Sequence, residues 1–277
     1  MGLRINTNVT SLAAQRTLGN NNADKAQTLG KLSSGTRIVR SADDAAGLAI
    51  SEKLKAQVRS TNQAERNAND GISMIQTAEG GLNEISNILI RLRELSIQSA
   101  SDTVGDTERK FTDLEYQNLK QEVERISQVT EFNGKKLLNG AGDSYDFQIG
   151  INNDEFQDRI SFDTQLLNSS IDNLGVAGLS VSSKESAQEG LASIDAAIQT
   201  VSGQRAELGA KQNRLTSTIQ NLQVSSENLS AANSRIRDTD YAAETAKKTK
   251  LDILTNAGTS VLAQSNAQGQ AALNLIG

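Results

Sequence analysis

Two adjacent aspartates, Asp43 and Asp44, have a spacing that could support chemistry. Neighbouring carboxylates can bind a metal ion or share acid and base roles. Here they follow Ser41 and precede an Ala-Ala-Gly-Leu run, which is typical of a helix start. Carboxylates in a first helical turn interact favourably with the positive end of the helix dipole. We therefore interpret the pair as helix-start electrostatics, with Ser41 opening the helix.

The composition argues against other catalytic chemistry. The 277 residues include no His and no Cys, so imidazole bases, thiol nucleophiles and soft metal sites are excluded. There is no phosphate-binding Gly loop, and the acidic residues alternate with Lys and Arg, as on solvated helix faces. The net charge of -5 gives no basic field for nucleic acid. We expect no catalytic residue, no cofactor and no metal site.

A long helical seam is the strongest structural signal. Between residues 191 and 236 apolar residues alternate in steps of three and four, which predicts a coiled coil of roughly 70 Å. The interleaved series of the seam has four polar members, Arg205, Gln212, Ser226 and Asn233. The fully apolar series comprises Ile194, Val201, Leu208, Leu215, Leu222, Leu229 and Ile236. A helix of this length needs partner helices, so the pattern favours an extended scaffold over a compact catalyst.

The N-terminal half supplies those partners. A second seam runs through Ile75, Ala78, Leu82, Ile85, Leu89 and Leu92. After a break at Gly105, a further amphipathic helix is predicted to about Thr130 from Phe111, Leu114, Leu119, Val123, Ile126 and Val129. The absence of Pro permits such long helices.

The middle of the chain, about residues 131–180, changes character. Asn133-Gly134 and Asn139-Gly140 are turn signals. Alternating apolar residues around Tyr145–Ile149 and Ile160–Phe162 predict two short strands, interpreted as a hairpin. Ser182 with Glu185 is a capping-box pattern for the start of the long C-terminal helix. The predicted fold class is mainly α: a long antiparallel helical bundle or coiled coil of the N- and C-terminal segments, with a small central β-hairpin region.

The two ends of the chain are weakly amphipathic. Residues 1–35 and 247–277 have thinly spaced apolar positions, which bury too little area to offset ordering entropy in isolation. Each end is expected to need the other, or neighbouring subunits. Residues 1–19 contain no continuous apolar run, so neither a secretory signal peptide nor a membrane span is expected.

Several motifs together resemble those of bacterial flagellins. At the N-terminal end they are Ile5-Asn6-Thr7-Asn8, Leu32-Ser33-Ser34-Gly35 and Asp43–Ser51, followed by Arg91–Ser99 and Phe132-Asn133-Gly134. At the other end they are Ala232–Ala242 and the stretch from Ile253-Leu254 to Val261–Gln264. The resemblance covers about residues 1–140 and 175–277.

The resemblance implies a minimal flagellin, a structural subunit that self-assembles into the filament used for motility. By analogy, residues 1–40 and 237–277 form an inner coiled-coil domain that is disordered in the monomer. Residues 41–236 form an outer helical bundle with the β-hairpin region. The resemblance also implies type III export to an extracellular flagellum, and partners that include an export chaperone, cap proteins and hook-junction proteins.

The same resemblance implies contact with the vertebrate Toll-like receptor that senses flagellin. The matching positions are Arg91, Leu95 and Glu115. Since the seam runs through Leu89, Leu92 and Ser96, we expect Leu95 near its edge and available for contacts. The alternatives to a filament subunit are a hook–filament junction protein and a non-polymerising helical adaptor, with an enzyme least favoured.

Overall fold

The computed structural model describes residues 7–274, with side chains through residue 267. The chain is mainly α-helical, with long helices packed against one another and two small antiparallel hairpins, which confirms the predicted fold class. The helices are α1 (Val9–Ser34), α2 (Ala45–Ser99), α3 (Asp106–Val129), α4 (Lys184–Arg237) and α5 (Tyr241–Asn274). None of the helices in residues 7–274 combines the length and apolar character needed to cross a bilayer.

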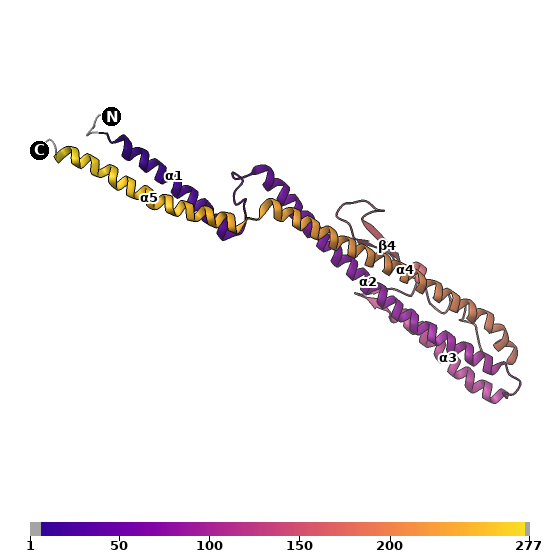
Figure 1. The fold of residues 1–277 in the computed structure, drawn as a ribbon. Helices are drawn as coiled ribbons and strands as arrows, with labels where there is room; N and C mark the ends of the chain where they lie inside the picture. Colours follow the sequence, from indigo (N-terminus) through magenta and orange to yellow (C-terminus); the bar gives the residue numbers. More distant parts are fainter. Residues whose placement is uncertain (1–6, 275–277) are drawn as a thin grey trace. The chain divides into compact units, whose positions relative to one another are not determined.

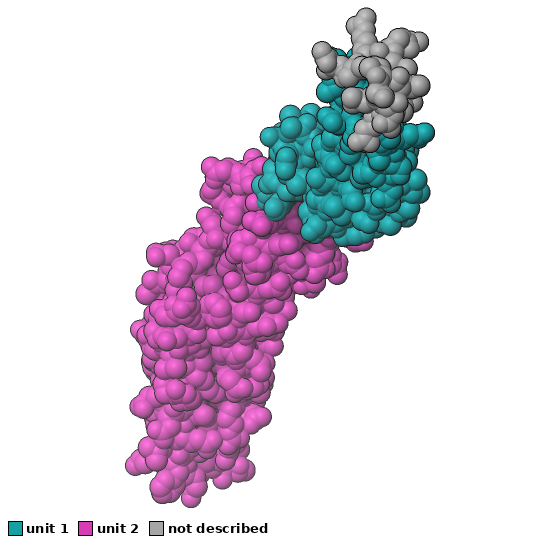
Figure 2. Space-filling view, turned by 90° about the vertical axis from the view of Figure 1, so that its left-hand side faces the viewer, with its two compact units in different colours: residues 1–56, 228–277 teal, residues 57–227 magenta. Residues whose placement is uncertain are grey.

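The chain divides into two compact units (Figure 2). Unit 1 comprises residues 1–56 and 228–277, and unit 2 comprises residues 57–227. The unit boundaries fall inside α2 and α4, so both helices contribute to both units. These bounds describe packing within one chain, and the predicted inner and outer filament layers remain a prediction.

In unit 2, α2, α3 and α4 lie side by side as a helical bundle (Figure 1). The apolar seams of α2 and α4 meet in one core, as the sequence predicted. The predicted α2 seam is fully buried throughout, at Ile75, Ala78, Leu82, Ile85, Leu89 and Leu92. The facing α4 positions Ile194, Val201, Leu208 and Leu215 are also buried. Burial of these side chains supplies the main driving force for the bundle.

Polar contacts between α2 and α4 show that the two helices are antiparallel and stay in register. Arg93 Nε donates to Asp195 Oδ1 over 2.6 Å, and Gln223 Nε2 donates to Glu65 Oε1 over 2.7 Å. From one contact to the other, α2 advances 28 residues (93 − 65) and α4 also advances 28 (223 − 195). That distance is a whole number of heptads, so the seam runs without a slip.

The structure corrects the predicted start of α2. The helix begins at Ala45, and Ser41 lies in the preceding turn. Asp44 is the capping residue, because its Oδ1 accepts the Gly47 N–H over 2.8 Å. Asp43 Oδ2 instead accepts the backbone N–H groups of Arg40 and Val39, and these bonds lower the pKa of Asp43. The aspartate pair therefore has a structural role, as predicted, with the cap three residues later than expected.

The predicted capping box of α4 is also displaced. Ser183, and not Ser182, precedes the helix, and its Oγ accepts the Ser186 N–H over 3.2 Å. Ser182 instead contacts Ser180, whose hydroxyl donates to its Oγ over 3.0 Å. The side chains of two adjacent serines can cap a helix equally well. Which of them does so depends on where tertiary packing makes the helix begin.

The central segment contains two hairpins. β1 (Glu131–Phe132) pairs with β2 (Lys135–Lys136) through a turn in which Asn133 has φ 50° and Gly134 has φ 76°. Positive φ at both central residues is what an Asn-Gly hairpin turn requires. β3 (Ser144–Gln148) pairs with β4 (Arg159–Asp163), with Tyr145 opposite Phe162. The predicted strands are confirmed, and a short 3₁₀ helix, η1 (Gln165–Leu167), follows β4.

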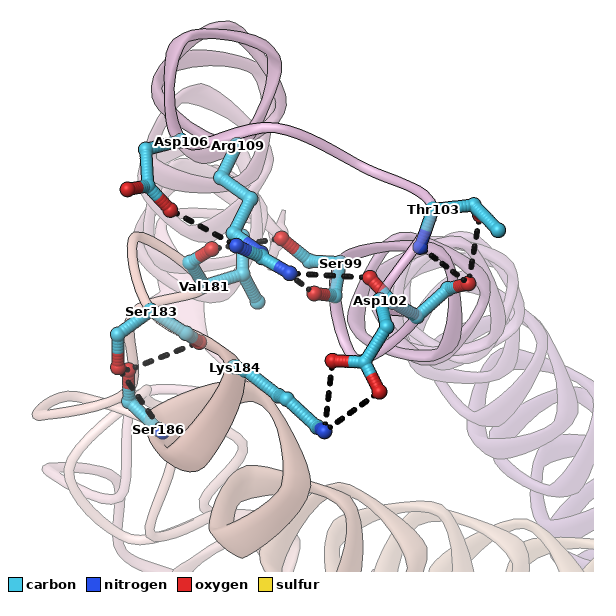
Figure 3. A network of polar contacts seen from close by, with 10 residues as sticks. Ser99, Asp102, Thr103, Asp106, Arg109, Val181, Ser183, Lys184 and Ser186 are labelled. Atoms are coloured by element: carbon cyan, nitrogen blue, oxygen red, sulfur yellow. Dashed lines mark hydrogen bonds and ion pairs between the residues drawn. The ribbon is translucent and has the colours of Figure 1, made fainter.

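A buried arginine anchors one end of the unit 2 bundle (Figure 3). Arg109, near the start of α3, donates from Nε to the Ser99 carbonyl and from Nη2 to the Ser101 carbonyl, each over 2.9 Å. A third bond joins its Nη1 to Asp106 over 2.8 Å. Because helix α2 ends at Ser99, the guanidinium satisfies carbonyls that have no intrahelical donor and carries positive charge to the negative end of the dipole.

Two further contacts connect this end to the start of α4 (Figure 3). The Ser99 hydroxyl donates to the Val181 carbonyl over 2.7 Å. Lys184 Nζ contacts Asp102 Oδ1 over 2.7 Å, and this contact lowers the pKa of Asp102. The end of α2, the start of α3 and the start of α4 are therefore held together by polar contacts.

Candidate assembly surfaces

In unit 1, α1 and α5 pack against each other as an antiparallel pair. Ser11 Oγ donates to Asn266 Oδ1 over 2.8 Å near one end of the pair. Towards the other end, Lys25 Nζ lies 2.6 Å from Asp252 Oδ1. The contacts of Asp252 with Lys25 and Lys248 lower its pKa. The pair is aligned largely by polar contacts.

The apolar side chains of this pair point mostly outward. The buried positions of α1 are polar, Ser11 and Thr28. By contrast, Val9 is 65% exposed and Ile253 is 63% exposed. Among the described side chains, further large exposed hydrophobic residues on α1 and α5 are Leu12, Leu29, Tyr241, Leu254 and Val261. Two helices cannot enclose apolar residues that lie around their circumference, so these side chains gain burial only from further helices.

The predicted assembly seam on α4 changes along its length. Its first four residues, from Ile194 to Leu215, are buried, whereas Leu222, Leu229 and Ile236 are half-buried. The polar members of the seam are half-buried, and two of them, Arg205 and Asn233, have a buried atom, Nε and Oδ1 respectively, without a hydrogen-bond partner among the described residues. In the first half of the seam the apolar residues are therefore buried within the chain, whereas in the second half they remain partly exposed.

Of the three predicted receptor-contact residues, Arg91 and Glu115 are exposed and Leu95 is buried. Arg91 is exposed, and both its Nε and Nη2 donate to Glu115 Oε1, over 3.0 and 2.9 Å. Arg91 also donates to Glu94, and these two carboxylates raise its pKa. Leu95 is only 2% exposed. The expectation that Leu95 lies at the seam's edge, available for contacts, is therefore wrong, because Leu95 belongs to the core in which α3 also packs.

The outward face of α3 also differs from the prediction. Phe111, Leu114 and Val129 were expected to face the bundle, but Phe111 is 70% exposed and Leu114 is 65% exposed. Of the predicted series Val123 is buried, and the other buried residues of α3 are Arg109, Tyr116, Lys120 and Ser127. The five buried positions are spaced by seven, four, three and four residues, as expected for one face of a helix. Most of them are polar, so a search for apolar residues at this spacing missed the polar ones. The exposed apolar residues of α3 are therefore available to a partner.

Lys120 shows how the buried face accommodates a cation. Its Nζ donates to the carbonyls of Ala177 and Leu179, over 2.5 and 2.8 Å, and to Gln117 Oε1 over 3.2 Å. Burial lowers the pKa of Lys120. These bonds attach the segment before α4 to the middle of α3.

Comparison with known proteins agrees with this architecture. Residues 5–143 match the bacterial flagellin N-terminal helical region, and residues 191–276 match the bacterial flagellin C-terminal helical region. A flagellin of Halalkalibacterium halodurans is 44% identical over 98% of this chain and 99% of its own length. The flagellar filament 30.7 kDa core protein of Treponema maltophilum is 43% identical over 98% and 99%, and a Bacillus subtilis flagellin is 42% identical over 99% and 100%.

Solved structures give the same fold. The crystal structure of Bacillus cereus flagellin has a TM-score of 0.50 and 30% identity, covering 57% of this chain and 88% of that one. A putative flagellar hook-associated protein from Vibrio parahaemolyticus has a TM-score of 0.58 over 71% of this chain and all of its own, but only 15% identity. The second likeness concerns the fold alone.

The long register-locked bundle and the outward apolar faces define a helical structural protein built to pack with further helices. The chain belongs to the bacterial flagellin family. It is a structural subunit of a bacterial flagellar filament, and it has the length of the shorter flagellins that it matches. The predicted motif residues Ile5 and Asn6 lie outside the described residues.

Proposed function

We propose that the chain polymerises through the outward apolar residues of the α1–α5 pair, which pack against the same pair in neighbouring copies. The observation that carries this proposal is the number of apolar side chains that unit 1 leaves exposed on α1 and α5, while Leu251 is buried beside the polar residues Ser11 and Thr28. Burial of apolar area between copies then supplies the free energy of assembly. In this view residues 1–40 and 237–277 form the inner layer of the filament and become fully ordered only there.

The proposal is tested by comparing Ile253→Asn with Asn256→Ala on the same helix. Both side chains are exposed in the single chain, so neither change should alter the melting of the monomer. Seeded polymerisation followed by electron microscopy should give filaments from the native chain and from Asn256→Ala, but few from Ile253→Asn. Normal filaments from Ile253→Asn would contradict the role of this surface.

We also propose that the free monomer contacts the vertebrate Toll-like receptor that senses flagellin through Arg91 and Glu115. The exposed ion pair between α2 and α3 supports this, since an arginine presented at a surface is a common centre of binding energy. Leu95 would act indirectly, by holding α2 and α3 together. In a reporter-cell assay Arg91→Ala should lower activation without altering the fold, while Leu95→Ala should lower both. Full activity of a folded Arg91→Ala variant would refute this contact.

The remaining parts of the proposal concern delivery. As a filament subunit the chain would leave the cell through the flagellar type III export apparatus with its export chaperone, and would join the extracellular filament between hook-junction and cap proteins. Family membership supports this route. Secretion of the chain by cells that lack the export apparatus would argue against it.

A further inference from the structure

The side of unit 2 carries an open groove between the β3–β4 hairpin and α4. Its volume is about 450 Å³, within the range of protein binding pockets. Ile149 is a buried residue in its lining, and Leu222 is a half-buried one. The wall that α4 contributes consists of Arg214, Ser217, Thr218, Asn221 and Leu222. The apolar residues leave room for an apolar side chain of another molecule.

The two ends of the groove wall formed by α4 differ in chemical character. Its five residues, from Arg214 to Leu222, recur in steps of three, one, three and one, so they lie on one face of the helix over about two turns. Arg214 stands at one end of this wall and Leu222 at the other. Arg214 is exposed and has no ion pair among the described residues. The groove therefore presents a cation at one end and an apolar surface at the other.

The exposed face of α3 also has a charged residue at one end and apolar residues at the other. Glu108, Phe111 and Leu114 recur every three residues, so they form one ridge on the helix surface. Glu108 is exposed and has no ion pair among the described residues. The ridge spans roughly 9 Å from Glu108 to Leu114, and the wall spans roughly 12 Å from Arg214 to Leu222, at the helical rise per residue. The charges of ridge and groove are therefore complementary, and the ridge is short enough to lie along the wall.

We propose that the α3 ridge of one copy of this chain docks in the groove of another copy. Glu108 then faces Arg214, and Phe111 and Leu114 cover Ile149 and Leu222. This inference rests on the proposed self-assembly and adds a second contact to it, in unit 2. Because ridge and groove are different surfaces, the contact is heterologous, and each copy that docks leaves a further groove available. Such a contact propagates along a filament without closing into a dimer.

A single chain cannot form this contact with itself. Asp113 of α3 accepts the Val181 N–H over 2.9 Å, which places the ridge level with the start of α4. The groove begins at Arg214, which is 30 residues beyond Lys184 (214 − 184). At the helical rise, this separates ridge and groove by about 45 Å along α4. The partner of each surface must therefore come from another molecule.

Charge reversal tests the pairing directly. Glu108→Arg places two cations in contact, and Arg214→Glu places two carboxylates in contact. Each single variant should raise the critical concentration for seeded polymerisation by roughly tenfold. An equimolar mixture of the two single variants should polymerise like the native chain, because each ridge then meets a groove of opposite charge. The control is Asn213→Glu, which introduces a carboxylate beside the groove but keeps Arg214, and it should have little effect.

The apolar part of the contact has its own test. Phe111→Ala should raise the critical concentration on the order of thirtyfold, as for a central apolar anchor, while Val129→Ala, an exposed residue on the same helix, should not. Monomer melting curves of every variant verify that it is folded. If the native chain fails to polymerise, the proposed self-assembly falls and this contact with it. If the native chain polymerises, the contact is refuted when the reversed variants assemble normally, or when their mixture assembles no better than either alone.

Discussion

Replacing Arg109 with Ala should destabilise the monomer more than any exposed substitution on α3. The substitution removes the donors to the carbonyls of Ser99 and Ser101. A hydrogen bond from a charged donor contributes about 1.5–3 kcal/mol. The Ser99 bond is buried and contributes fully, whereas water can partly replace the Ser101 bond. The ion pair with Asp106 adds little, because the Asp106 side chain is 89% exposed. We expect a loss of about 3 kcal/mol.

The assay is urea unfolding of the monomer followed by far-ultraviolet circular dichroism, since the chain has no Trp for fluorescence. The matched control is Arg125→Ala on the same helix. Arg125 forms an exposed pair with Glu122, so its removal should cost at most about 0.5 kcal/mol. Arg109→Lys retains the charge but not the forked geometry, and it should fall between the two. If Arg109→Ala is as stable as Arg125→Ala, the buried guanidinium does not hold the bundle end together.

Other substitutions and conditions give further expected outcomes. Leu215→Ala should cost the monomer roughly 2–5 kcal/mol, and Leu222→Ala clearly less, because Leu222 is only half-buried; equal losses in thermal melts would contradict this difference. Burial raises the pKa of Tyr116 from 10.0 to about 12, so the stability from its neutral form is complete below pH 10 and is lost as pH rises through about 12. Tyr116→Phe should therefore unfold at higher pH than the native chain, and an unchanged alkaline transition would refute this role. Amide exchange in residues 1–35 and 247–277 should be rapid in the free monomer and slow in the filament, and equal protection in both would argue against conditional order.

The sequence was sufficient for the main seams, for the β3–β4 hairpin and for the turn at Asn133-Gly134. Leu82 and Leu208 belong to apolar series that repeat every seven residues, and such a series has few solutions other than a shared helical core. Likewise, Asn133-Gly134 adopts positive φ at both residues, which few other dipeptides tolerate. These signals are local, and the tertiary structure did not overrule them.

Properties that depend on three helices could not be predicted in the same way. Leu95 lies beside the α2 seam, and it becomes buried because the core includes α3 as well as α4. Arg109 and Lys120 were not assigned to the core from the sequence, and backbone carbonyls from other segments provide their bonds. The position of a carbonyl in space is not encoded in the periodicity of the helix that contacts it. For that reason the predicted series on α3 was right at Val123 and wrong at Phe111 and Leu114.

The unbroken register between α2 and α4 restricts how the length of this protein can change during evolution. Inserting one residue in either helix would rotate everything beyond it by about 100° and expose the seam. Tolerated changes must therefore add or remove whole heptads from both helices at once, opposite one another. The length of the bundle in such a chain can therefore change only in steps of about 10 Å, which is one heptad. The hairpin segment between the helices is not bound by this rule and can change in length by single residues.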